Sequence, residues 1–189
     1  MILEDLYCLV DDFCKTFMPE WHASLIENQI RQKPWSCQMS PSEIMLIMIL
    51  FHQQQYRNFK TFYLMHVQKY MSTDFPTLLS YSRFVEQMKS ITVPLFFFLM
   101  HLPKSETGVY FIDSTTLKVC HIKREKQHKV FKGKAEKSKS TMGWYYGFKL
   151  HIVVNSRGDI MNLKLTSAKE DDRKPVEDLT QELFGKLVG

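Results

Sequence analysis

The spacing of apolar residues changes near Gly108, and this change constrains the fold more than any other feature. Before it, apolar residues recur every three or four positions, which is typical of amphipathic helices. After it, apolar and polar residues alternate, as they do in half-buried strands. The 189 residues are enough for one domain or two small ones. We therefore expect an α+β or α/β protein with an all-α domain over residues 1–105 and a sheet-containing domain over residues 106–189.

Local signals fix where the helices of the first domain begin and end. Pro19 is expected to end the first helix, and Pro94 to end or kink the last one. Ser40, Pro41 and Glu43 supply an N-cap, a proline at the first helical position and a capping-box glutamate. Four helices are predicted. The first covers residues 3–17, the second starts at residue 41, the third follows Asn58 and the fourth starts near Ser80.

The last two of these helices are joined by a turn at Ser72–Pro76. Tyr81, Arg83 and Gln87 are expected on or near the exposed face of the helix that follows. Two interpretations remain open. The pair is a helix-turn-helix that contacts DNA through these three residues, or it belongs to an ordinary helical bundle with short turns.

Three strands and a helix are predicted after Gly108. The turn residues Asn155–Gly158 favour a hairpin between the second and third strands. Pro175 opens the helix, and Gly185 or Gly189 closes it. The strands are centred on residues 109–112, 148–154 and 160–165, and the helix runs to Phe184.

Asp113 directly follows the apolar run Val109–Ile112, so we expect it at a strand end. Because Asp is depleted in strands, it either starts a turn or is kept for its charge. Ser114 and Thr115 are expected to be turn hydroxyls, since no G-x-S-x-G elbow surrounds them. A carboxylate held against phosphate needs a cation between them. The lysines nearby therefore point to a divalent metal and phosphodiester chemistry.

Basic residues are concentrated just after Asp113. Between Lys118 and Lys149 there are ten basic residues and two acidic ones. Such a tract either follows a nucleic-acid backbone, with strong salt dependence, or is a solvated loop. The candidate DNA-binding residues are Lys118, Lys123, Arg124, Lys126, Lys129, Lys132, Lys134, Lys137, Lys139, Lys149 and His151.

Four polar residues outside the tract's centre have two interpretations each. Lys149 and His151 share one face of the second strand, where they either point at the same substrate as Asp113 or face water at a sheet edge. Asp171 and Asp172 precede the Pro175 helix, and there capping or helix-dipole stabilisation is favoured over catalysis.

Zinc, secretion and membrane insertion are not indicated. The four cysteines form no C-x-x-C pair, so we expect reduced thiols in a cytosolic protein. The first residues lack the basic start of a secretory signal. The most apolar runs, Ile44–Phe51 and Leu95–Met100, are far shorter than a span of roughly 20 residues.

Five motifs occur in order along the second half: Phe111–Thr115, Leu117–His121, His128–Gly133, Met142–His151 and Asp171–Pro175. Together with Ser80–Glu86, they resemble the bacterial insertion-sequence transposases of the DDE type, in the group numbered nine-eighty-two. The resemblance covers nearly the whole chain. It implies a ribonuclease-H-like core in which Asp113 is the first of three catalytic carboxylates.

In that family, two aspartates and a glutamate bind magnesium (or manganese), which activates water and then a DNA 3′ hydroxyl for attack on phosphodiesters. The resemblance implies that the helical domain binds the terminal inverted repeats of double-stranded DNA. It also implies a cytoplasmic, nucleoid-associated bacterial protein with no membrane partner, able to form homo-oligomers.

The chain departs from the family pattern at its end. The family's second aspartate lies in a D-K-G-Y motif just beyond a helix ending like Leu183–Leu187, and the sequence stops at Gly189. We therefore expect a truncated core that lacks a C-terminal part and binds no metal tightly. The Asp113 strand is expected to be an unprotected sheet edge, the chain to be poorly folded beyond Gly108, and DNA cleavage to be absent.

Three functions follow from these features. The first is a DDE transposase, inactive as this fragment. The second is a non-catalytic DNA-binding remnant that occupies element ends or inhibits an intact transposase. The third is a basic RNA-binding or nuclease-accessory protein.

Overall fold

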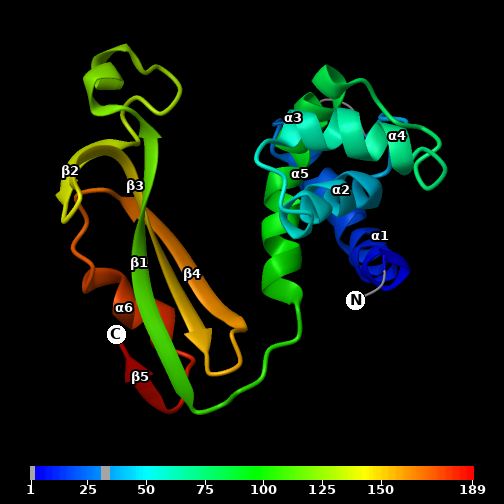
Figure 1. The fold of residues 1–189 in the computed structure, drawn as a ribbon. Helices are drawn as coiled ribbons and strands as arrows, with labels where there is room; N and C mark the ends of the chain where they lie inside the picture. Colours follow the sequence, from blue (N-terminus) through cyan, green and yellow to red (C-terminus); the bar gives the residue numbers. More distant parts are fainter. Residues whose placement is uncertain (1–2, 31–34) are drawn as a thin grey trace. The chain divides into compact units, whose positions relative to one another are not determined.

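The computed structural model describes residues 3–30 and 35–189, and the chain divides into two units, Met1–His101 and Leu102–Gly189. The first unit is helical, and the second is built on a mixed five-stranded sheet, as an α+β protein should be (Figure 1). The helices are α1 Leu3–Glu27, α2 Pro41–Gln53, α3 Phe59–Phe62, η1 Tyr63–Val67, α4 Gln68–Tyr70, α5 Tyr81–His101, η2 Ile122–Gln127 and α6 Lys174–Thr180. The strands are β1 Val109–Cys120, β2 Glu136–Ser140, β3 Gly143–Asn155, β4 Ile160–Ser167 and β5 Lys186–Val188.

Helix α2 forms the centre of the first unit. Ile44 and Ile47 are fully buried, and α2 packs against both α1 and α5. The predicted capping box is confirmed: Ser40 Oγ accepts from the Glu43 amide at 3.1 Å, and Glu43 Oε2 accepts from the Ser40 amide at 2.6 Å. This local signal sets the start of the helix on which the unit is assembled.

Neither proline ends its helix, so the prediction for Pro19 was wrong, and of the two alternatives for Pro94 the helix end is excluded. Helix α1 continues through Pro19 to Glu27, and α5 continues through Pro94 to His101. Aromatic packing beyond each proline compensates for the backbone hydrogen bond that the proline cannot donate. Trp21 stacks on Phe17 with centroids 5.9 Å apart, and Phe98 contacts the Phe13 ring at 5.3 Å.

The third helix begins after Asn58, as predicted, because Asn58 Oδ1 accepts from the Thr61 amide at 2.8 Å. It is not a regular α-helix, since the π-helical turn η1 separates α3 from α4. Tyr63 of η1 is buried, and its hydroxyl donates to Leu79 O at 2.7 Å. Burial raises the pKa of Tyr63 to about 12.

The sheet of the second unit has the order β2-β3-β1-β5, and β4 also pairs with β3. All pairs are antiparallel except β1 with β5, which is parallel. The predicted β3–β4 hairpin is confirmed. Its turn is held by Asn155 Oδ1, which accepts from the amides of Arg157 and Asp159, both at 2.9 Å.

Several elements of this unit differ from the prediction. Strand β1 runs to Cys120, and the lysine tract contributes η2 and β2. Helix α6 ends at Thr180, which leaves room for the unpredicted β5. Gly185 at φ 142° lets the chain approach Gly108, where the Lys186 amide donates to Gly108 O at 2.8 Å.

The expected unprotected edge is therefore only partly present. Strand β5 pairs with Val109–Phe111 and covers the beginning of β1 on the side away from β3. Within the described residues, β1 has no strand partner on that side from Ile112 onward.

Candidate active site and nucleic-acid interface

The register of β1 and β3 assigns their side chains to two faces of the sheet. Tyr110 and Val153 lie on one face, in a buried cluster with Leu179 of α6, and we call this the covered face. Asp113 is paired with Ile152 and lies on the other face, which we call the open face. The open-face residues of these strands are Phe111, Asp113, Thr115, Leu117, Phe148, Leu150, Ile152 and Val154. Phe111 is 44% exposed, so apolar surface surrounds the carboxylate.

Asp113 lies within β1 rather than at its end, which corrects the sequence-based expectation. Ser114 and Thr115, expected to be turn hydroxyls, are strand residues that follow it. The Asp113 side chain is exposed, and its Oδ1 accepts from the Ser114 amide at 2.7 Å. An exposed carboxylate on the open face is accessible to a large substrate.

Asp113 does not by itself make a metal site. Over residues 3–30 and 35–189, no group of three or more His, Cys, Asp or Glu side chains is placed to hold a metal ion. Magnesium and manganese need several oxygen ligands, and a two-metal site needs separated carboxylates. The described residues supply one candidate ligand and do not fit the complete magnesium centre implied by the family.

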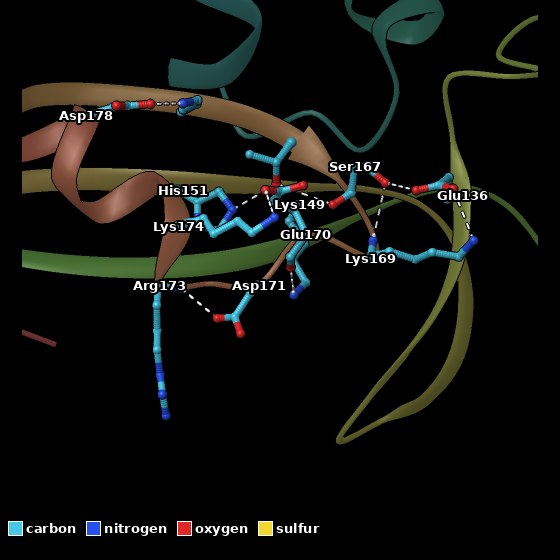
Figure 2. Close-up of polar contacts among 12 residues, drawn as sticks. Glu136, Lys149, His151, Ser167, Lys169, Glu170, Asp171, Arg173, Lys174 and Asp178 are labelled. Atoms are coloured by element: carbon cyan, nitrogen blue, oxygen red, sulfur yellow. Dashed lines mark hydrogen bonds and ion pairs between the residues drawn. The ribbon is translucent and has the colours of Figure 1, made fainter.

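Lys149 and His151 cannot share a substrate with Asp113, because they lie on the covered face, opposite Ser114 and Thr116 in the register. Figure 2 shows them among the polar groups that tie β3 to β4 and to the segment before α6. Lys149 Nζ donates to Glu170 O at 2.8 Å and forms an ion pair with Asp172 Oδ1 at 3.1 Å.

His151 is only 2% exposed, and its Nε2 lies 2.9 Å from Thr166 Oγ1. Burial lowers the pKa of His151. A neutral, enclosed imidazole and a paired ammonium group stabilise the sheet rather than present charge to DNA.

Asp171 and Asp172 have structural partners. Asp171 Oδ1 accepts from the Arg173 amide at 2.9 Å, which closes the turn before α6, as Figure 2 shows. The side chain of Arg173, the N-cap of α6, makes no capping hydrogen bond, so the expected capping takes the form of a turn. Asp172 instead pairs with Lys149.

The remaining candidates of the lysine tract are all exposed. They are Lys118, Lys123, Arg124, Lys126, Lys129, Lys132, Lys134, Lys137 and Lys139. Three of them, Lys126, Lys132 and Lys137, line a cavity of about 320 Å³ together with Lys169. Sequence analysis missed Lys169 because it lies far along the chain, after β4, and no local pattern marks it.

The three helical candidates have different surroundings. Arg83 is exposed, whereas Tyr81 is half-buried against Phe59, with ring centroids 6.4 Å apart. Gln87 lines a surface cavity of about 440 Å³ in the first unit. Helices α4 and α5 are joined by residues 71–80, longer than the three- or four-residue turn of a helix-turn-helix. The ordinary-bundle interpretation fits this connection better.

Comparison with known proteins finds one family whose model matches the second unit. Residues 104–189 match the family model described as a transposase DDE domain. No curated protein and no solved structure matches the chain. Among the described residues, none of the helices combines the length and apolar character needed to cross a membrane. The family match supports a DDE transposase, and with it a part in DNA transposition.

Proposed function

We propose that the chain acts in DNA transposition as part of a DDE transposase of an insertion sequence in group nine-eighty-two, with Asp113 as one metal-binding carboxylate. The observation that carries the proposal is the transposase DDE domain over residues 104–189, which includes Asp113 on the open face of the sheet. An exposed carboxylate on the open face of β1, with cations on the adjoining segment, suits a phosphodiester substrate.

The proposed fold of the second unit is a ribonuclease-H-like core. Three neighbouring antiparallel strands of the sheet, β1, β3 and β4, are followed by α6 and by β5, which runs parallel to β1; the short β2 lies between β1 and β3 in the sequence. This agrees with the strand-strand-strand-helix order implied by the resemblance. The parallel register, Phe111 opposite Val188, directs β5 toward the part of β1 that bears Asp113.

The proposed partner is double-stranded DNA at the inverted-repeat ends of the element. The nine exposed Lys and Arg side chains of the lysine tract are available to phosphates. In the helical unit, Arg83 is the exposed member of the three candidate contacts.

A second candidate function is DNA binding without catalysis, by a protein that occupies element ends or inhibits an intact transposase. One observation favours it for this polypeptide alone. Within the described parts of the chain, no group of three or more His, Cys, Asp or Glu side chains is placed to hold a metal ion with Asp113. Magnesium-dependent cleavage then needs carboxylates from other residues or another chain.

A nicking assay separates the two functions. The purified 189-residue chain is incubated with supercoiled plasmid carrying the DNA that flanks its gene, with Mg²⁺ or Mn²⁺, and compared with an Asp113→Asn variant. We expect both proteins to bind the plasmid and neither to nick it. Metal-dependent nicking that disappears in Asp113→Asn would show that the chain alone is a complete enzyme.

A further inference from the structure

The β2–β3 hairpin carries four side chains of related chemistry on one face. Lys137 is paired with Tyr146, and Lys139 with Trp144, in an antiparallel register. Cross-strand partners share a face, and so do residues two apart on one strand. Alternation along β3 places Trp144 and Tyr146 on the same face as Phe148, which is the open face that bears Asp113.

The tip of this hairpin exposes large apolar side chains. Trp144 is 59% exposed, and Met142 in the turn is 86% exposed. Lys137 Nζ lies 5.0 Å from the centroid of the Trp144 ring, so an ammonium group already contacts the indole. An exposed indole offers ring surface on which another aromatic ring can stack. With lysine ammonium groups beside it, the indole favours a partner that carries both an aromatic ring and a negative charge.

A basic cavity adjoins the hairpin. Lys126, Lys132, Lys137 and Lys169 line it, and Lys137 thus belongs both to the cavity and to the Trp144 contact. The cavity also contains Glu125 and Glu136. Glu136 is already bonded to Ser167 and forms an ion pair with Lys169 at 3.1 Å, as Figure 2 shows. The cavity therefore keeps a surplus of positive charge suited to phosphate.

We propose that the β2–β3 hairpin binds unpaired DNA: one nucleobase stacks on Trp144, while Lys137, Lys139 and the lysine-lined cavity hold the neighbouring phosphates. The inference rests on the proposed function for DNA as the partner, and it specifies the form of the DNA. In a duplex each base is stacked on its neighbours, so a free indole gains most from a base outside the stack.

The test compares single-stranded and duplex DNA. Fluorescence anisotropy measures binding of the purified chain to a labelled single strand of about 16 nucleotides, a length within known stacking-site sizes, and to its duplex. Trp144→Leu is expected to weaken single-strand binding about 5- to 150-fold, the range for losing one stacked base. It should change duplex binding less than about twofold, since duplex binding is mainly electrostatic.

Two control variants and two spectroscopic measurements accompany the test. Trp144→Phe keeps a stacking ring and should restore most of the affinity. Phe184→Ala removes a side chain that is 91% exposed in the same unit and should change neither affinity. Because Trp144 is exposed, circular dichroism of all variants should match that of the parent chain. The strand should also quench tryptophan emission in the parent chain, and this quenching should be lost in Trp144→Leu.

Each negative result has a distinct meaning. If the parent chain binds both forms of DNA and Trp144→Leu binds the single strand equally well, the hairpin inference is overturned and the proposed function stands. If the folded parent chain binds neither form, both are overturned.

Discussion

Replacing Lys137 and Lys139 together by alanine should weaken duplex DNA binding and reduce its salt dependence. Both side chains are exposed on one face of the β2–β3 hairpin. Each ammonium group that neutralises a duplex phosphate contributes about −0.9 to the slope of log K against log salt. Losing two contacts should make the slope less negative by about 1.8. Over a fourfold rise in salt, the parent chain should therefore lose about 12-fold more affinity than the variant.

Lys149→Met is the matched control. It also removes a lysine from the candidate DNA-binding set, but Lys149 Nζ is held by Asp172 and Glu170 on the covered face. Its salt slope should equal that of the parent chain, while its thermal stability should fall. Anisotropy titrations of one labelled duplex at several salt concentrations measure all three proteins. Equal slopes for the parent and the double variant, or a changed slope in Lys149→Met, would refute the assignment of faces.

Three further predictions concern stability. Ser40→Ala should lower the free energy of unfolding by about 1 kcal/mol through loss of the α2 cap, measured by urea denaturation; an unchanged midpoint would contradict the cap's contribution. Gly147→Ala should cost about 1–3 kcal/mol, because its Cβ would lie 1.9 Å from Leu117 O and push β1 from β3, and native stability would contradict this register. Burial lowers the pKa of His151, so the unfolded chain takes up this proton at higher pH than the folded chain, and stability should fall as the pH drops below about 6.5. His151→Gln should remove that part of the pH dependence while keeping a bond to Thr166, and an unaltered pH profile would count against it.

Features set by neighbouring residues could be predicted from the sequence. Ser40 and Glu43 satisfy each other's backbone groups within one turn, so their pattern locates α2. Asn155 likewise organises its own turn, and the β3–β4 hairpin follows from it. The apolar run before Asp113 likewise predicts a strand there, although Asp113 lies within β1 and not at its end.

Features set by pairing between distant segments could not be predicted. Ser114 and Thr115 look like turn residues, yet they extend β1 because β3 supplies partners more than thirty residues away. The face on which Lys149 and His151 lie depends on that same register, in which a shift of one residue exchanges the faces. Strand β5 is too short to carry a pattern of its own, and it forms where Gly185 meets Gly108.

DNase I footprinting across the DNA that flanks its own gene tests whether the chain serves DNA transposition. We expect two protected segments, one on each side of the gene and related as inverted repeats. Protection should persist in Asp113→Asn, which removes the candidate metal ligand and not the lysines. Uniform protection without preference for the flanking repeats, or none, would contradict the claim.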